Sequence, residues 1–174
     1  MDDKTGCVEL SMDMNNPRVL YAAMSEYGRL PWKVISGGQG KGLYKSSDAG
    51  QTWEKIQEGL PKELGKMAVS VCRSNSDRVY ALIESDSDKE LGGLFVSTNA
   101  GKNWTRVTND HRLIQRAWYY IELFTDPKDE HTIYVMSAPA MRSIDGGKTW
   151  EYLSGTHCRG THHIDCMLVL RIGE

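Results

Sequence analysis

The eight residues "SSDAGQTW", Ser46–Trp53, contain a pattern that occurs three times in the chain. The second copy is "STNAGKNW", Ser97–Trp104, and the third is "SIDGGKTW", Ser143–Trp150. The copies lie about fifty residues apart, and a repeat of this period is typical of solenoid and propeller folds, in which each repeat forms one supersecondary unit. The pattern therefore predicts that three equivalent structural units follow one another along the chain.

Each copy lies among short segments whose composition predicts β-strands. Aligning Tyr21, Tyr80 and Tyr134 superposes three second strands, "RVLYAA", "RVYALI" and "TIYVMS". The strand before each of these alternates apolar and polar residues, with apolar side chains at Val8, Leu10 and Met12, at Met67, Val69 and Val71, and at Ile121 and Leu123. A third strand ("GLYKS", "GLFVS", "AMRS") leads into the repeated octapeptide, and a fourth ("TWEKI", "NWTRV", "TWEYL") leaves it. Four antiparallel strands per repeat predict the blades of an all-β propeller.

The octapeptide is interpreted as the turn between the third and fourth strands. The Ser46 hydroxyl and the Asp48 carboxylate are suited to accept backbone N–H bonds within a tight turn. Gly50 permits a positive φ, and Trp53 supplies a large apolar face for the neighbouring strands. The structural residues predicted for the three turns are Ser46, Asp48, Gly50, Trp53; Ser97, Asn99, Gly101, Trp104; and Ser143, Asp145, Gly147, Trp150. This pattern favours a structural role for the acidic residues over a catalytic one.

The pattern resembles the Asp-box, or BNR, repeat of sialidases, sortilin-type receptors and xyloglucan-degrading propeller hydrolases. Only Asn99 departs from the consensus, and the resemblance covers about Gly6 to Leu153. The phrase "NNPRVLYAA…PWKVISGGQGKGLYKSSDAGQTWEKI" is most similar to bacterial sortilin-like or glycosyl-hydrolase BNR-repeat proteins. The resemblance implies a secreted, periplasmic or extracellular location and a propeller with more blades than three.

The expected organisation is one partial propeller domain over residues 1–174. Blades are predicted at about residues 6–57, 65–108 and 118–154, with the first strand of a truncated fourth blade from about residue 162. Three blades do not close a ring, so both outer blades are expected to expose an open side. We therefore interpret the chain as a fragment whose partners include the remaining blades of a larger parent protein.

Composition excludes several other classes of protein. The net charge is −2, from 21 basic and 23 acidic residues, and no basic block predicts a nucleic-acid surface. No apolar run approaches the roughly 20 residues that a bilayer-spanning helix needs. The N-terminal residues lack the profile of a signal peptide. The four cysteines form no CxxC pair; we expect them to be mostly free, although Cys158 and Cys166 could pair across a turn.

Candidate functional residues are expected on the face of the propeller opposite the Asp-box turns. Strand direction alternates within a blade, so the links between second and third strands, and those between blades, share this face, which we call the insertion face. It is predicted to receive the insertion Met24–Gly42, the acidic segment Glu84–Gly93 and the links between blades. Ligand-binding candidates there are Tyr27, Arg29, Trp32, Arg116, Trp118, His162 and His163. Trp32 is suited either to stack on a sugar ring or to pin its own glycine-rich loop.

Two further clusters have a structural and a chemical interpretation. The acidic segment around Asp86, Asp88 and Glu90 has enough carboxylates for a glycosidase pair, but a solvated loop is favoured. The segment "HCRGTHHIDC", His157–Cys166, contains metal-competent side chains, yet it matches no standard zinc spacing. We therefore predict neither a metal nor another cofactor, and no catalytic residue is assigned.

Two functions remain open. One is a carbohydrate-associated, glycoside-hydrolase-like protein, which the resemblance and the aromatic residues of the insertion face imply. The other is a non-catalytic, sortilin-like propeller that binds a peptide, protein or glycan on the same face. An activity screen on glycans separates the two, because only the first predicts turnover.

Overall fold

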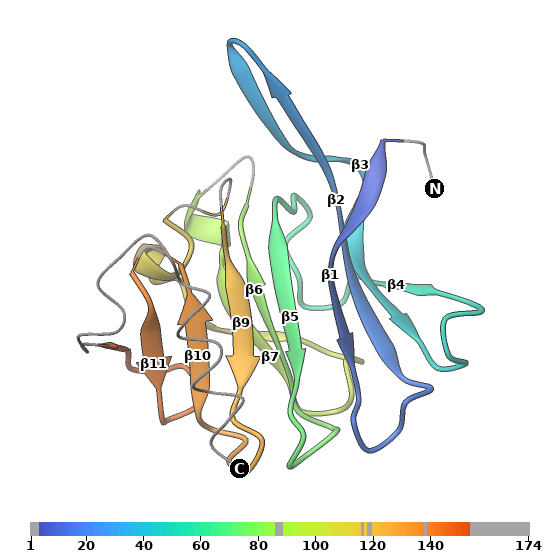
Figure 1. Cartoon of the computed structure of the whole chain (residues 1–174), viewed down its shortest axis with the longest axis vertical. Helices are drawn as coiled ribbons and strands as arrows, with labels where there is room; N and C mark the ends of the chain where they lie inside the picture. Colours follow the sequence, from blue (N-terminus) through green and yellow to red (C-terminus); the bar gives the residue numbers. More distant parts are fainter. Residues whose placement is uncertain (1–3, 86–88, 116, 118–119, 138, 154–174) are drawn as a thin grey trace.

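The fold consists of three four-stranded antiparallel sheets that follow one another along the chain (Figure 1). The computed structural model describes residues 4–85, 89–115, 117, 120–137 and 139–153. The first sheet contains β1 (Thr5–Met12), β2 (Leu20–Leu30), β3 (Lys33–Ser46) and β4 (Glu54–Ile56). The second contains β5 (Met67–Val71), β6 (Val79–Ile83), β7 (Gly93–Ser97) and β8 (Thr105–Thr108). The third contains β9 (Glu122–Thr125), β10 (Ile133–Met136), β11 (Met141–Ser143) and β12 (Glu151–Tyr152).

Each sheet is a meander in which every strand pairs with the next along the chain. In the part of the chain that the structure describes, two short 3-10 helices, η1 (Lys89–Leu91) and η2 (His111–Leu113), lie in connections. The structure confirms the all-β class and the three four-stranded antiparallel blades of a partial propeller. The start of a fourth blade, predicted from about residue 162, lies outside the described residues.

The three sheets share one register. The aligned tyrosines occupy equivalent positions on the second strands: Tyr21 pairs with Ser11, Tyr80 with Ser70 and Tyr134 with Phe124. This equivalence lets a position in one sheet be compared directly with the same position in the others.

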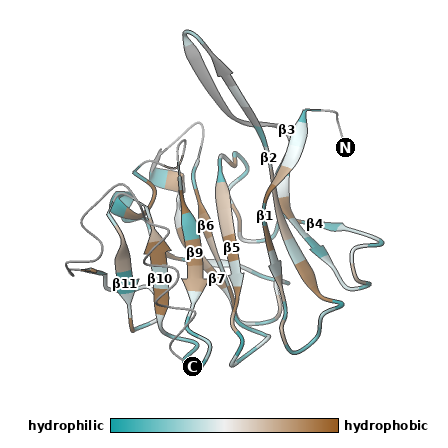
Figure 2. Ribbon diagram, in the orientation of Figure 1, coloured by the Kyte–Doolittle hydropathy of each residue, from teal (hydrophilic) through white to brown (hydrophobic). Residues whose placement is uncertain are grey.

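The core lies between consecutive sheets. Figure 2 shows hydrophobic residues along strands of these sheets, such as β5 and β10. The first cluster joins Tyr21, Ala23 and Leu43 of the first sheet to residues of the second that include Met67 and Val69. The second cluster joins the other face of the second sheet to the third, with members Tyr80, Leu82, Leu94, Ile121, Leu123, Ile133, Val135 and Met141. The second sheet is therefore buried on both faces, which explains why every residue of β6 is buried.

Polar contacts also cross both junctions between sheets. At the first junction the Val71 N–H donates to Ser11 Oγ at 3.1 Å. At the second, Arg78 Nε lies 3.1 Å from Glu130 Oε2, and the Tyr80 hydroxyl donates to the Glu130 carbonyl at 3.0 Å. Hydrogen bonds that connect neighbouring blades fix their relative position more narrowly than apolar packing alone.

The segment Met24–Gly42 forms ordered strands where the sequence suggested a glycine-rich loop. β2 and β3 continue pairing from Glu26 opposite Gly37 to Leu30 opposite Lys33, after a bulge between Met24 and Glu26. The two strands make a long β-hairpin that projects beyond the rest of the sheets (Figure 1). Backbone hydrogen bonds along the hairpin offset the low strand propensity of its glycines. Sequence composition alone does not reveal this strand pairing.

The residue before the Asp-box glycine adopts a left-handed conformation in all three turns. Ala49 has φ 65°, Ala100 has φ 55° and the equivalent Gly146 has φ 77°. Because alanine is strained at positive φ, Ala100→Gly is expected to raise the free energy of unfolding by about 0.5 kcal/mol. The reverse change, Gly146→Ala, should lower it by about 1 kcal/mol. Urea denaturation of both variants checks this, and a loss of stability in Ala100→Gly would contradict it.

Candidate functional site

The Asp-box turns occupy one end of the sheets and have nearly identical geometry. In the first turn the Gly50 N–H donates to Ser46 Oγ at 2.8 Å, and the Ser46 hydroxyl donates to Asp48 Oδ1 at 2.8 Å. The Trp53 indole N–H then donates to the Gly50 carbonyl at 3.1 Å. The same three contacts recur in the second and third turns, with Asn99 Oδ1 replacing the carboxylate in the second.

The Asp-box carboxylates are held in their ionised form by these turns. Hydrogen bonds from the Thr52 side chain and backbone, with a further one from Ser46, lower the pKa of Asp48 to about 2. Bonds from Thr149 lower the pKa of Asp145 in the same way. A carboxyl group with a depressed pKa is a poor proton donor near neutral pH, so the arrangement favours a structural role.

The β2–β3 hairpin lies at the opposite end of the sheets and presents an aromatic side chain. Its tip contains Trp32, whose side chain is 80% exposed. Tyr27 pairs through its backbone with Ser36 and Arg29 with Val34, so both lie on the hairpin, but their side chains are outside what the structure describes. The Trp32 side chain is therefore exposed to solvent, and its stacking on a sugar ring stays a prediction.

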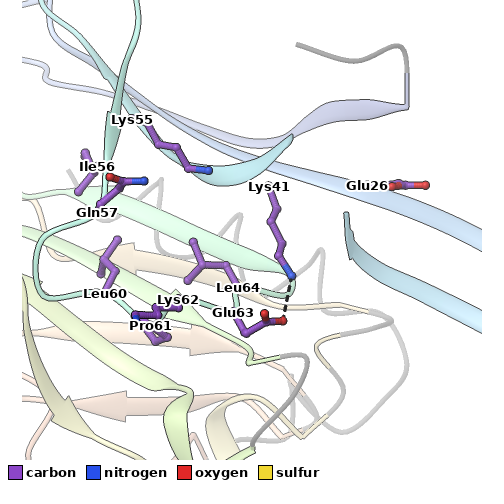
Figure 3. Close-up of a pocket in the computed structure, with 10 residues that line it drawn as sticks. All are labelled: Glu26, Lys41, Lys55, Ile56, Gln57, Leu60, Pro61, Lys62, Glu63 and Leu64. Carbon is purple, nitrogen blue, oxygen red and sulfur yellow. Dashed lines mark ion pairs between the residues drawn. The ribbon is translucent and has the colours of Figure 1, made fainter. Parts of the chain in front are cut away.

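A groove lies between the base of this hairpin, strand β4 and the link that leads to the second sheet (Figure 3). Its volume is about 850 Å³. Ten residues line it: Glu26, Lys41, Lys55, Ile56, Gln57, Leu60, Pro61, Lys62, Glu63 and Leu64. Lys41 from β3 extends toward Glu63 of the link, with 3.6 Å between Nζ and Oε2. The groove therefore combines an apolar part with amines, carboxylates and an amide that can form hydrogen bonds.

The two described carboxylates of the acidic segment, Glu84 and Glu90, have different hydrogen-bond partners. Glu90 Oε2 accepts from Asn109 Nδ2 at 3.2 Å, and its Oε1 lies 3.4 Å from His111 Nε2. Glu84 is held next to the start of β5, where its Oε2 accepts from the Lys66 N–H at 3.3 Å. Asp86 and Asp88 lie outside the described residues.

An ion pair within the segment that links the second sheet to the third holds that segment in place. Asp110 Oδ2 accepts from Arg112 Nη2 at 2.6 Å, and the Arg112 guanidinium lies over the Tyr152 ring. This ion pair lowers the pKa of Asp110 and raises that of Arg112. The two groups neutralise each other, so they are weak candidates for capturing a charged ligand.

Several predicted residues cannot be placed in this site. The side chains of Arg116, Trp118, His162 and His163 lie outside the described residues, as does the whole segment His157–Cys166. Cys7 and Cys72 carry free thiols, the state predicted for most of the cysteines. Among the described residues, no group of three His, Cys, Asp or Glu side chains is arranged to hold a metal ion, and no helix has the length and apolar character to cross a bilayer.

A cluster that the sequence did not indicate lies near the inner strands β1, β5 and β9. Burial, together with the nearby charge of Glu122, raises the pKa of the Glu9 carboxyl to about 7. Burial lowers the pKa of Lys66, against the opposing effect of Glu122, Glu84 and Glu9. The Oε2 atom of Glu122 is buried without a hydrogen-bond partner. These residues come from three different blades, so no local sequence pattern could have brought them together.

Comparison with known proteins places this geometry among propellers. The family described as Sortilin-Vps10 (sortilin, neurotensin receptor 3) matches residues 41–163. A probable oligoxyloglucan-reducing end-specific xyloglucanase from Neosartorya fischeri is 27% identical over 161 residues, which cover 86% of this chain and 18% of that protein. The chain thus spans a small part of the length of this relative.

Two solved structures show the same fold at low sequence identity. The GH74 enzyme of Niastella koreensis aligns with a TM-score of 0.60 and 20% identity, over 86% of this chain and 22% of the enzyme. YCF48 bound to D1 peptide aligns with a TM-score of 0.58 and 16% identity, over 86% of this chain and 41% of YCF48. Because the family match covers well over half of the residues and the fold agrees with it, the chain belongs to the Sortilin-Vps10 family of Asp-box propeller proteins.

Proposed function

We propose that this chain is part of a larger, secreted Asp-box propeller that binds a glycan on its insertion face. The observation that carries the proposal is the Trp32 indole, 80% exposed at the end of a paired hairpin. An exposed tryptophan costs favourable burial unless it has a partner, and its flat apolar face suits the apolar face of a sugar ring. The similarity to a probable oligoxyloglucan-reducing end-specific xyloglucanase supports a glycan as that partner.

The groove at the base of the hairpin supplies polar groups for the same ligand. Gln57, Lys55 and Lys62 provide donors for hydroxyl groups, while Glu26 and Glu63 provide acceptors. Sites for small polar ligands generally combine an apolar surface with a few convergent hydrogen-bonding groups, as this groove does. We expect a saccharide chain to contact Trp32 with one ring and the groove with others.

Hydrolysis of the bound glycan is the second outcome that this groove is tested for. Glycoside hydrolases use two carboxyl groups, and Glu26 and Glu63 are the acidic side chains that line the groove. Glu63 is already paired with Lys41, an arrangement that favours binding over acid–base chemistry. We therefore propose that the protein binds a glycan. Hydrolysis of that glycan is measured in the binding experiment described below.

The alternative ligand is a peptide or protein, as in a sortilin-like receptor. Ile56, Leu60, Pro61 and Leu64 give the groove an apolar part that a peptide side chain could enter. Membership of the Sortilin-Vps10 family and the likeness to peptide-bound YCF48 support this second function. A peptide ligand would use the groove more than the exposed indole.

Replacing Trp32 tests the choice between these ligands. We expect Trp32→Ala in the full polypeptide to weaken binding of xyloglucan oligosaccharides at least tenfold, which is about 1.4 kcal/mol, because the stacking surface is lost. Isothermal titration calorimetry measures the affinity, and release of reducing sugar measures turnover. Ile144→Ala is the control, since Ile144 is 63% exposed within the third Asp-box turn, at the other end of the sheets. Unchanged glycan affinity in Trp32→Ala, or no glycan binding by the parent, would contradict the proposal.

A further inference from the structure

The groove at the base of the hairpin is lined by more amines than carboxylates. Lys41, Lys55 and Lys62 contribute ammonium groups, and Glu26 and Glu63 contribute carboxylates. Figure 3 shows Glu26 apart from the other lining residues, whereas Glu63 faces Lys41. The part of the groove that adjoins β3, β4 and the link between the first two sheets therefore has an excess of positive charge.

The Lys55 side chain is held against strand β3, next to Lys41. A Cβ atom on Gly42 would lie only 2.7 Å from Lys55 Cε, so the absence of a side chain at Gly42 makes room for the Lys55 stem. The Lys55 Nζ atom lies 5.8 Å from the centre of the Tyr44 ring, whose face attracts a cation. Gly42 directly follows Lys41 in β3, so both lysines contribute their amines to the same part of the groove.

Only part of this positive charge is compensated by the described residues. Lys41 Nζ lies 3.6 Å from Glu63 Oε2, which exceeds the usual N–H···O separation of about 2.7–3.2 Å. The Lys41 side chain is 18% exposed and that of Glu63 is 55% exposed. Among the described residues, no carboxylate lies within ion-pair distance of Lys55 or Lys62. A largely buried ammonium group has three donors, and a single long ion pair leaves it able to bind a second anion.

The equivalent cation of the second sheet has an acceptor within the chain. Lys55 pairs with Tyr44 on β3, and Arg106 pairs with Phe95 on β7 at the same register position. The Arg106 guanidinium donates through Nη1 to the Glu90 carbonyl of η1. In the first sheet, no oxygen of the described residues accepts a hydrogen bond from Lys55 Nζ. The donors of Lys55 are therefore directed to solvent or to a ligand in the groove.

We propose that the groove binds the carboxylate of a uronic acid residue, in an acidic glycan, between Lys41 and Lys55. This inference rests on the proposed glycan binding and specifies which class of glycan binds more tightly. A carboxylate has two acceptor oxygens, so one group can contact both ammonium groups at once. Gln57 and Lys62 then provide donors for sugar hydroxyls. The 80% exposed indole of Trp32 favours a sugar over a peptide as the carrier of this carboxylate.

Two glycans that differ only in charge test this inference without any substitution. A trimer of galacturonic acid and its methyl ester have the same rings and the same length, but only the acid carries carboxylates. At pH 7 and about 50 mM NaCl, we expect the full polypeptide to bind the acid about tenfold more tightly than the ester in isothermal titration calorimetry. At about 500 mM NaCl the preference should fall to about twofold, because salt screens the charges. Equal affinities at low salt would overturn the inference.

Substitution of the two lysines locates this preference in the groove. The double variant Lys41→Gln, Lys55→Gln should reduce the ratio of the acid and ester affinities to about twofold or less, because both charges are lost. The double variant Lys41→Arg, Lys55→Arg keeps both charges and should retain the preference for the acid. Lys148→Gln is the control, since Lys148 is exposed in the third Asp-box turn and should not affect the ratio. A glutamine double variant with the parent's ratio would overturn the assignment to Lys41 and Lys55.

The outcomes separate this inference from the proposed function on which it rests. Binding of neither galacturonate trimer nor xyloglucan oligosaccharide would contradict the proposed function and this inference together. Equal binding of the acid and the ester would contradict only the preference for a carboxylate. A peptide of three glutamates serves as the competing probe, because it carries the same number of side-chain carboxylates. Tighter binding of this peptide than of the acidic trimer would overturn the assignment to a glycan in favour of an acidic peptide.

Discussion

Replacing Gly101 with alanine is expected to lower the free energy of unfolding by about 3 kcal/mol, of which roughly 1 reflects backbone strain and the rest a clash. Gly101 has φ +80°, where a side chain is strained. The new Cβ would also lie 2.7 Å from Tyr21 Cε1 and 3.2 Å from the Tyr21 hydroxyl oxygen. Tyr21 is fully buried, so its ring has no free space into which it could move.

Gly50→Ala in the chain described here is the matched control for this prediction. Gly50 has a similar φ of +87°, but its nearest neighbours would be 3.5 and 3.7 Å from the new Cβ. We therefore expect Gly50→Ala to lower the free energy of unfolding only by the contribution of backbone strain, about 1 kcal/mol. Urea denaturation at pH 7 gives both values. Equal losses in the two variants would show that the junction between the first two sheets adapts to the extra methyl group, contrary to the packing argument.

The contrast between these glycines gives the Asp-box turn a second physical role. Hydrogen bonds that link the Ser97, Asn99 and Trp104 side chains to one another and to the Gly101 backbone close the turn within its own blade. The glycine then allows the preceding blade to approach the turn closely. A Ser-x-Asp-x-Gly-x-x-Trp repeat consequently determines both a local turn and the spacing between neighbouring sheets.

The sequence predicted the strands well because their signals are local. Alternation around Val69 and the aligned tyrosines place each strand in its register, and the octapeptides place the turns. The same alternation placed Leu10 on the correct strand, yet it could not show that this side chain is 56% exposed. Burial depends on the neighbouring sheet, and no pattern within a strand reports whether that sheet is present.

The candidate site was predicted only in outline. The sequence predicted ligand contact on the insertion face and named Trp32 there, but it suggested a loop where β2 and β3 form a hairpin. Lys41 and Glu63 meet only because the hairpin base and the link between sheets converge in space. The Glu9, Lys66 and Glu122 cluster likewise depends on the approach of three blades, which is a property of the whole fold.

Glu9 is expected to make the stability of the chain depend on pH between about 5 and 7. Burial first, and the charge of Glu122 second, raise the pKa of its carboxyl from 4.5 to about 7 in the folded state. A raised pKa means that the folded state binds the proton more tightly than the unfolded state does. The resulting stabilisation is complete below pH 4.5 and is lost as the pH rises through 7, so the free energy of unfolding should fall by about 2 kcal/mol across this range.

Glu9→Gln should remove most of this slope, because the amide is neutral at every pH and has nearly the same shape. Urea denaturation at pH 5, 6, 7 and 8 measures the slope, with Glu54→Gln on the exposed part of β4 as the control. The other titratable groups are present in the parent and in both variants, so their contribution cancels in the comparison. At pH 8 the Glu9→Gln variant should be more stable than the parent, since it avoids a half-buried carboxylate. A variant with the parent's slope would show that another group controls the pH dependence and that Glu9 ionises freely in the folded state.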